Sequence, residues 1–266
     1  MPQMKRMGWL ICIATLVRCI VAITVALGND EVYYLSYAQY LQWNYFDHPP
    51  MVALLIRLTT FNLYFSNELF IRLGPILLAA INTGLIFNLT KKIKDEQAGF
   101  IAAVLFTASP YCSIIAGTFI LPDAPQLFFW IIGITISADL VQSPNVTKQF
   151  NHKLLLFGLF SGLCMMSKIH GIFLWIGVGV FILLYRRNLL SNVYLYFSII
   201  ITAILITPIL IWNIQNNFIT YSFHSERVSI NNGLQIDSFI RELSGGIFYN
   251  NPVTFFLIII SLIALF

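Results

Sequence analysis

Charged residues are scarce in this sequence: Asp, Glu, Lys and Arg together make up 10% of the 266 residues. A soluble domain usually carries about a quarter charged residues. Hydrophobic residues make up 58% of the chain, so lipid suits most of it better than water does. The basic residues are scattered and the net charge is +4, which excludes the dense basic stripe that nucleic-acid binding needs.

The sequence is also poor in cysteine and in the short motifs of soluble enzymes. Its four cysteines lie inside apolar runs without CxxC spacing, which favours small buried hydrophobic side chains over disulfides or a metal site. P-loop, GxGxxG, HExxH and GxSxG patterns are absent. The chemistry of this chain therefore has to come from isolated polar residues.

What the sequence has in abundance is long apolar runs. A membrane-spanning helix needs about 20 mostly apolar residues. The runs predict an all-α polytopic membrane protein, 1–266 as a single domain, with about eight transmembrane helices. These lie at 9–27, 70–90, 98–117, 124–141, 154–168, 171–185, 193–212 and 252–266.

Three of these runs leave alternatives open. The fifth and sixth are short and are separated by Ser167–Gly171, so they could instead form one long broken helix. The eighth reaches Phe266 without a polar flank, from which we expect the chain to be the first part of a longer protein or a truncated one.

Lysine and arginine in short loops predict the orientation. With the N-terminus in the cytoplasm, the basic residues next to helix ends fall inside: Lys5, Arg6, Lys91, Lys92, Lys94, Lys148, Lys153, Arg186 and Arg187. A cleaved signal peptide is the alternative for the first run, but its length and Arg18 favour an uncleaved span. Segments 28–69 and 213–251 are then external loops. The first contains an aromatic-rich stretch that predicts amphipathic helices at the membrane interface.

Asp30-Glu31 follows the first span directly. An acidic pair of this kind commonly caps a helix N-terminus, and taken alone that is the favoured interpretation. A carboxylate at this position could also act as a general base toward an incoming hydroxyl or amine.

Asp47-His48-Pro49-Pro50 and the turn around Asp123 are two further acidic sites on the external side. The prolines hold Asp47 and His48 in an extended turn, which favours a helix start over a two-ligand divalent cation site. Pro122 and Pro125 bracket Asp123, which either caps the next helix or is a functional carboxylate at membrane depth.

Basic residues on the same side are the candidate anion contacts. Lys168 and His170 separate two short apolar runs, and His224 and Arg227 lie in "SFHSERV". Each either reaches toward lipid headgroups or wet surface, or holds a phosphate. Arg18, in the middle of a span, must pair with something or face a cavity.

The order of these motifs is more specific than any one of them. Asp-Glu after the first span, "WNYFDHPPMVALLIRL", "PDAP", "GLCMMSKIHG" and "PILIWNIQNNFITYSFHSERV" follow one another. This order resembles the membrane-embedded glycosyltransferases of the C superfamily. It is most similar to the bacterial branch related to protein O-mannosyltransferases and lipid A aminoarabinose transferases. The resemblance covers about residues 9 to 230 and implies the fold of that superfamily (GT-C), in a shortened form.

The resemblance implies an inverting transfer of a sugar from a polyprenyl-phosphate donor to a lipid, glycan or protein acceptor outside the cytoplasmic membrane. It makes Asp30 the general base and Asp123 the second acidic residue of the site. The resemblance also implies that Asp47 and His224 together bind a divalent metal, which is the expected cofactor. Relatives often have Lys before the paired prolines, where this chain has His48. The expected substrate-binding residues are Glu31, Tyr34, His48, Lys168 and Arg227.

Two rival functions fit parts of the pattern. A transporter or lipid flippase would need charges on several spans near the membrane midplane, whereas here Arg18 lies mid-span and the other polar residues gather at one face. A non-catalytic membrane subunit or truncated pseudo-enzyme is the other rival, which the end of the chain at Phe266 favours. Membrane lipids are partners in every case, and nucleic acid is not expected.

Overall fold

The computed structural model describes residues 3–228 and 236–264. The described chain is helical, which confirms the predicted all-α class. Its α-helices are α1 (Gln3–Thr24), α2 (Asn29–Gln39), α3 (Met51–Thr59), α4 (Glu68–Ile93), α5 (Glu96–Ala108), α6 (Asp123–Gln142), α7 (Lys148–Ser167), α8 (Ile172–Tyr185), α9 (Val193–Gln215), α10 (Ile219–Val228), α11 (Ile236–Tyr249) and α12 (Pro252–Ile263). Short turns of other helix types are η1 (Tyr111–Ile115), η2 (Ile169–Gly171) and η3 (Arg187–Ser191).

Fewer of these helices meet the requirements of a membrane span than the expected eight. By length and composition α1, α4, α6 and α9 qualify among the described residues, and α11 with α12 makes a fifth if this pair, bent by 103°, is one span. The expected span 98–117 is instead α5 followed by the π-helical turn η1. Ser109 precedes Pro110, and a residue in that position avoids the helical region; its ψ of 123° ends α5.

The fifth and sixth runs form two helices that fold back on each other. Lys168 is extended, with φ −159° and ψ 137°, and it ends α7. Gly171 lies so close to the preceding turn that an added Cβ would be 2.6 Å from the Met165 nitrogen. The rings of Phe157 and Trp175 then meet with centroids 4.9 Å apart, which the alternative of one long broken helix does not allow.

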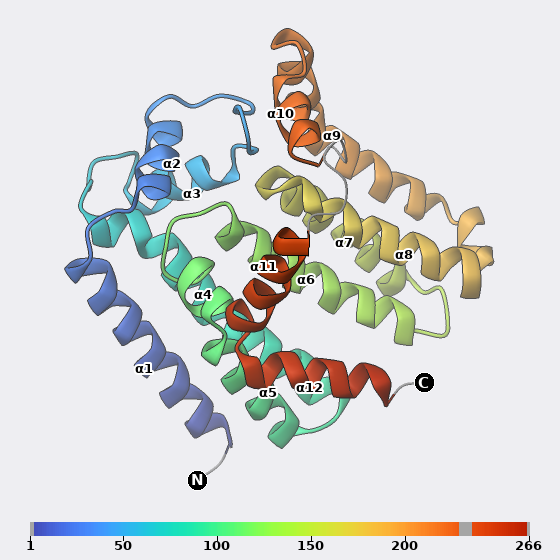
Figure 1. Cartoon of the computed structure of the whole chain (residues 1–266). Helices are drawn as coiled ribbons and strands as arrows, with labels where there is room; N and C mark the ends of the chain where they lie inside the picture. Colours follow the sequence, from blue (N-terminus) through green and yellow to red (C-terminus); the bar gives the residue numbers. More distant parts are fainter. Residues whose placement is uncertain (1–2, 229–235, 265–266) are drawn as a thin grey trace.

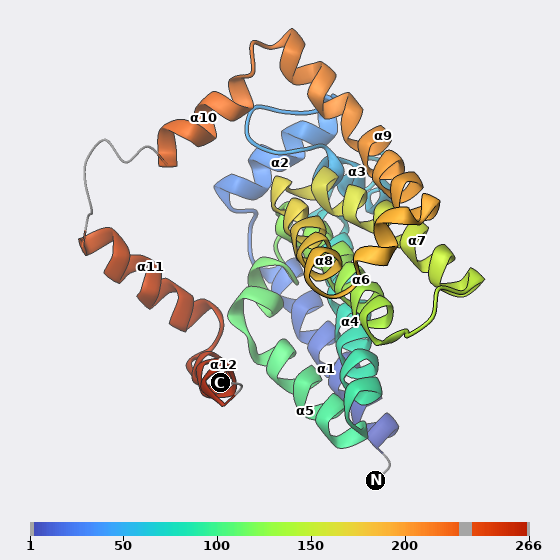
Figure 2. The same ribbon diagram turned by 90° about the vertical axis from the view of Figure 1, so that its right-hand side faces the viewer.

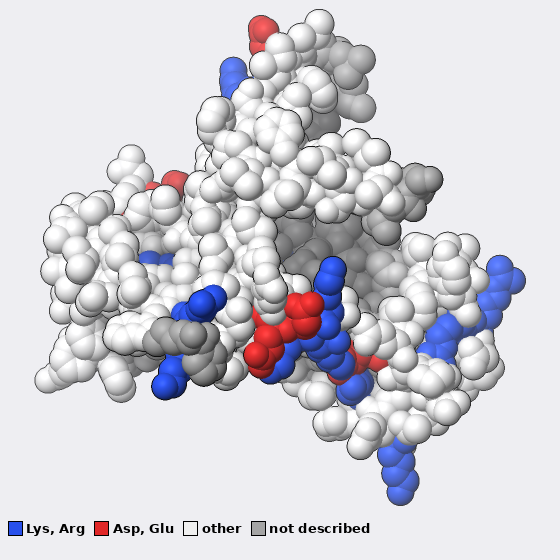
Figure 3. Space-filling model, turned by 90° about the horizontal axis from the view of Figure 1, so that it is seen from below, with Lys and Arg blue, Asp and Glu red and all other residues white. Residues whose placement is uncertain are grey.

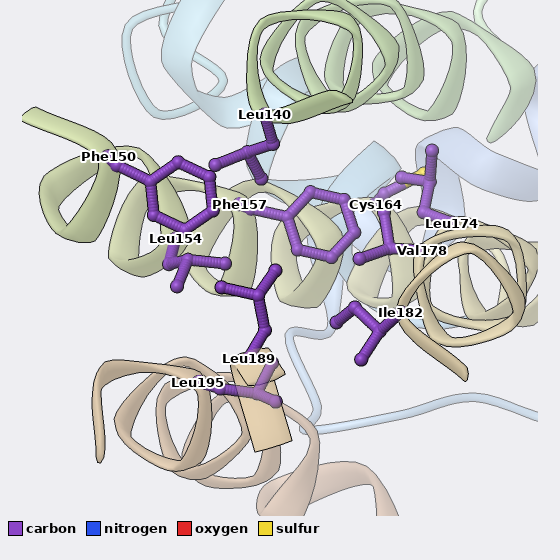
Figure 4. Packing of buried hydrophobic residues seen from close by; sticks show 10 residues of the cluster. All are labelled: Leu140, Phe150, Leu154, Phe157, Cys164, Leu174, Val178, Ile182, Leu189 and Leu195. Atoms are coloured by element: carbon purple, nitrogen blue, oxygen red, sulfur yellow. The ribbon is translucent and has the colours of Figure 1, made fainter. Parts of the chain in front are cut away.

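Helices α6, α7, α8 and α9 share an apolar core. Figure 4 shows this cluster, in which Phe157 of α7 lies close to Val178 of α8. Gly158 lets α7 and α9 approach closely, since a Cβ there would lie 2.2 Å from the Ser198 oxygen. The cluster consists of Leu140, Phe150, Leu154, Phe157, Cys164, Leu174, Val178, Ile182, Leu189 and Leu195. It fixes the α7–α8 junction, and with it Lys168.

The two ends of the helical bundle differ in chemistry. The chain start, the α4–α5 turn and the α6–α7 loop lie at one end (Figure 1). Lys92 and Lys153 both pair there with Asp139, and Lys and Arg side chains gather on that face (Figure 3). Helices α2, α3 and α10 lie at the opposite end, where Figure 2 shows α10 above α2.

The expected interface helices in segment 28–69 are α2 and α3. Large aromatic side chains stay exposed on and around them, with Tyr64 80% exposed and Tyr40, Trp43 and Phe61 also outside the core. Aromatic residues of this kind are enriched where a membrane meets water. The acidic motifs of the sequence therefore lie at an end of the bundle suited to a lipid headgroup region.

Candidate functional site

A buried ion pair holds the start of α2 in place. The Arg72 guanidinium of α4 donates from Nε to Glu31 Oε1 over 2.7 Å and from Nη2 to Glu31 Oε2 over 2.6 Å. Arg72 is 0% exposed and also donates to the carbonyls of Ala22, Val25 and Ala26, at the end of α1. The carboxylate of Glu31 further accepts from the backbone nitrogens of Gly28 and Ile120. Glu31 thus serves as a structural anchor between α1, α2 and α4.

Asp30 lies beside this anchor but faces outward. It is the second residue of α2 and its side chain is exposed. The role of helix cap falls to Glu31, whose carboxylate accepts from the Gly28 nitrogen over 2.9 Å. Asp30 borders a cavity of about 400 Å³ together with Asn29, Phe119 and Leu121. The exposed carboxylate of Asp30 therefore faces an open cavity, and the ion pair beside it holds the start of α2 in place.

The second acidic residue, Asp123, forms an ion pair with Lys168. The Nζ atom of Lys168 lies 3.1 Å from Asp123 Oδ1 and 3.3 Å from Oδ2. The Tyr111 hydroxyl donates to the same Oδ1 over 2.7 Å. The two side chains remain partly open, 23% for Lys168 and 15% for Asp123. The sequence pattern singled out both residues, and the fold brings them together across 45 positions.

The third acidic residue, Asp47, is engaged by tyrosines of α2. Its Oδ1 accepts from the Tyr37 hydroxyl and, over 3.4 Å, from the Tyr33 hydroxyl. His224 of α10 approaches the backbone carbonyl of Asp47 at 2.9 Å and does not meet its carboxylate. Among the described residues, no group of three or more His, Cys, Asp or Glu is arranged to hold a metal. As placed here, Asp47 and His224 do not fit the expected metal pair, and we derive no chemistry through a metal.

The corner between α9 and α10 brings His224 to this loop. Asn217 and Phe218 have φ values of 54° and 55°, in the left-handed region that non-glycine residues seldom adopt. The chain reverses there, and the Thr220 hydroxyl then donates to the Tyr45 carbonyl over 3.0 Å. Asn44 donates to the same Thr220 hydroxyl. The side chain of Arg227, four residues after Phe223, lies outside what the structure describes.

Tyr34 packs against the rings of Tyr33, Tyr37 and His48. It is buried, and burial together with the charges of Asp47, Asp30 and Asp123 raises the pKa of its hydroxyl. The Tyr34 hydroxyl therefore stays protonated at pH 7. Burial lowers the pKa of His48 to about 4, against the opposing pull of Asp47. The His48 ring is therefore neutral at pH 7.

Two cavities meet at Lys168 and His170. One, of about 370 Å³, is also bordered by Asp47, His48 and His224. The other, of about 360 Å³, is bordered by Tyr111, Gln126 and Trp130. A cation shared by two cavities is placed to contact a charged group entering from either one.

Sequence reasoning missed Arg72, Tyr111 and Tyr37. Arg72 lies near the start of the apolar run 70–90, and a charge at that position in so charge-poor a chain was the one available signal. Its partner Glu31 lies 41 residues away. Nothing in the local sequence distinguishes Tyr111 and Tyr37 from the other tyrosines.

Comparison with known proteins supports the resemblance. Residues 47–212 match the family model described as dolichyl-phosphate-mannose-protein mannosyltransferase. The chain is 27% identical over 190 residues to the lipid A galacturonosyltransferase RgtD of Rhizobium johnstonii, which covers 71% of this chain and 38% of that relative. The chain thus spans well under half the length of this curated relative.

Two solved structures share the fold. The Saccharomyces cerevisiae protein O-mannosyltransferase Pmt1–Pmt2 complex, bound to its sugar donor, matches 82% of this chain and 34% of its own with a TM-score of 0.55 and 17% identity. The Archaeoglobus fulgidus oligosaccharyltransferase AglB, in complex with an inhibitory peptide and a dolichol-phosphate, matches 97% of this chain and 38% of its own with a TM-score of 0.55 and 14% identity. With a family model matching more than half of its residues, the chain belongs to the dolichyl-phosphate-mannose-protein mannosyltransferase family of membrane glycosyltransferases.

Proposed function

We propose that this protein transfers a glycosyl group from a polyprenyl-phosphate-linked sugar to an acceptor at the outer face of the cytoplasmic membrane. The observation that carries the proposal is the arrangement at one end of the bundle. The exposed carboxylate of Asp30 borders one cavity at this end, and Lys168, paired with Asp123, is shared by two others. Family membership and the donor-bound relative support this choice of reaction.

The reaction needs a base on one side of the sugar and a cation on the other. The acceptor's hydroxyl or amine passes its proton to Asp30 as its oxygen or nitrogen attacks the anomeric carbon. The bond from that carbon to the phosphate oxygen breaks on the opposite face, which inverts the configuration. The departing phosphate takes the bonding electrons, and Lys168 offsets the charge that develops on it.

The remaining candidate residues surround these two groups. Asp123 holds Lys168 through the ion pair at 3.1 Å. His48 borders the same cavity as Lys168 and, being neutral at pH 7, offers a hydrogen bond and not a charge to the donor. Tyr34 contacts the His48 ring at a centroid distance of 6.0 Å. Lipid, glycan and protein acceptors all carry hydroxyl or amine groups that fit the role.

Replacing Lys168 tests the phosphate contact. Lys168→Ala removes the cation from both cavities, and we expect donor affinity to fall at least tenfold, because charge-assisted contacts to phosphate are among the stronger hydrogen bonds. The measurement is binding of a fluorescent polyprenyl-phosphate sugar to the purified protein. The exposed Lys94→Ala is the matched control and should bind as the wild type does. Unchanged donor affinity in Lys168→Ala would leave the residue as a headgroup contact at the interface.

Reporter fusions test the proposed orientation. The basic end of the bundle is the cytoplasmic end by the positive-inside rule, so segment 28–69 is external. Fusions of a compartment-sensitive reporter after Leu63 and after Lys94 should report opposite sides, with the Lys94 fusion in the cytoplasm. Both fusions on one side, or the reverse assignment, would contradict the orientation.

A further inference from the structure

A buried arginine in the first span has no part in the chemistry above. Arg18 lies in α1, is 3% exposed, and among the described residues no carboxylate forms an ion pair with it. Its Nε donates to the Ser113 carbonyl and its Nη2 to the Ser113 hydroxyl, each over 3.3 Å. A charge inside a spanning helix is costly and usually functional, so these contacts need an explanation.

Ser113 is the central residue of the π-helical turn η1. π-Helical turns are rare in proteins, and those that occur are often found at functional sites. The Ser113 carbonyl that accepts from Arg18 also accepts from the Thr118 hydroxyl over 2.8 Å. Gly117 completes the turn at a point where a Cβ would lie 2.4 Å from the Cys112 oxygen. Arg18 of α1 and Thr118 thus both hold the turn by donating to Ser113, and the turn is packed too closely at Gly117 for a side chain.

The first residue of the same turn reaches the proposed site. Tyr111 donates its hydroxyl to Asp123 Oδ1 over 2.7 Å, and Lys168 lies 3.1 Å from that same oxygen. Two donors on one carboxylate oxygen fix its orientation more tightly than one. A shift of η1 would therefore withdraw Tyr111 and change how Asp123 holds Lys168.

We propose that Arg18 is a positioning residue that acts through the π-helical turn and Tyr111 on the Asp123–Lys168 pair. The inference rests on the proposed function for its kinetic consequence, whereas the link from Arg18 to Tyr111 is a property of the fold. The guanidinium suits this task because its planar fork reaches both oxygens of Ser113 at once, which the ammonium of a lysine does not.

A double-mutant cycle tests the kinetic consequence in the full-length protein. Arg18→Met and Tyr111→Phe should each lower kcat about tenfold, the effect of about 1.4 kcal/mol on the transition state. If the two residues act in series, the double variant loses no more than either single one. Losses that multiply to about a hundredfold would mean that Arg18 acts independently of Tyr111, which would overturn the proposal. If Arg18→Met does not fold, Arg18→Lys takes its place in the cycle.

A second readout does not depend on activity. With 3-fluorotyrosine at position 111, the ¹⁹F resonance should move in Arg18→Met and stay in place in Cys19→Ala, a substitution of the next residue in α1. An unmoved resonance in Arg18→Met would refute the link even in an active protein. If the wild type transfers no sugar, the proposed function fails, and the resonance still decides whether Arg18 positions Tyr111.

Discussion

Asp30→Asn should lower turnover by about two to four orders of magnitude, the usual contribution of a general base. The amide has nearly the size of the carboxylate but cannot take a proton from the acceptor. The fold should survive, because Asp30 makes no contact in the Glu31–Arg72 anchor. Loss of the favourable interaction between the carboxylate and the helix dipole should cost less than about 1 kcal/mol. The measurements are kcat and the thermal unfolding temperature of the purified variant.

Glu68→Gln is the control for this prediction. Glu68 is also an exposed carboxylate in the first turn of a helix, α4, and its replacement should leave both turnover and stability near the wild-type values. If Asp30→Asn retains turnover within a few-fold of the wild type, Asp30 contributes only to the helix start and the base must be sought elsewhere.

Arg72→Met should have the largest effect on stability of any single substitution proposed here. It leaves the Glu31 carboxylate buried without its partner, together with the carbonyls of Ala22, Val25 and Ala26. Breaking a buried ion pair typically costs about 3–5 kcal/mol. We expect a strongly lowered unfolding temperature in detergent and a low yield of folded protein. The half-buried Arg57→Met, which removes hydrogen bonds without stranding a carboxylate, should cost much less.

The double variant Glu31→Gln with Arg72→Met shows how much of the lost stability comes from the unpaired Glu31 charge and how much from lost packing. Removing both charges avoids the stranded carboxylate, so the double variant should be more stable than the sum of the two single losses predicts. Losses that add without interaction would show that the two side chains stabilise the fold separately, contrary to their contacts at 2.6 and 2.7 Å.

The side of the bundle on which the site lies could be predicted from the sequence, and its inner connections could not. Alternation of apolar runs and basic loops put Asp30, Asp47, Asp123 and Lys168 at one end, where the structure has them. Each pairing, however, joins positions far apart, such as Glu31 with Arg72 over 41 residues and Lys168 with Asp123 over 45. Contacts between such distant positions leave no local sequence pattern, so the Glu31–Arg72 pair could not be predicted.

Fewer helices than the expected eight meet the length and hydropathy requirements of a span among the described residues, for a local reason. An apolar run shows that a segment avoids water but not that it stays helical. Ser109-Pro110 ends α5 after 13 residues, although the apolar run continues. The polar start of α7, with Lys148 and Lys153, lowers its hydropathy below that of a typical span. Attention to the residue before proline would have corrected the first case.

The most direct test of the account is an assay of the purified full-length protein against a panel of polyprenyl-phosphate sugars. We predict that at least one donor is consumed in the presence of an acceptor and that the product has inverted anomeric configuration. Asp30→Asn should lower the transfer by about two to four orders of magnitude while still binding that donor. Consumption of no donor on the panel, or a product of retained configuration, would contradict the proposed transfer from a lipid-linked sugar at this site.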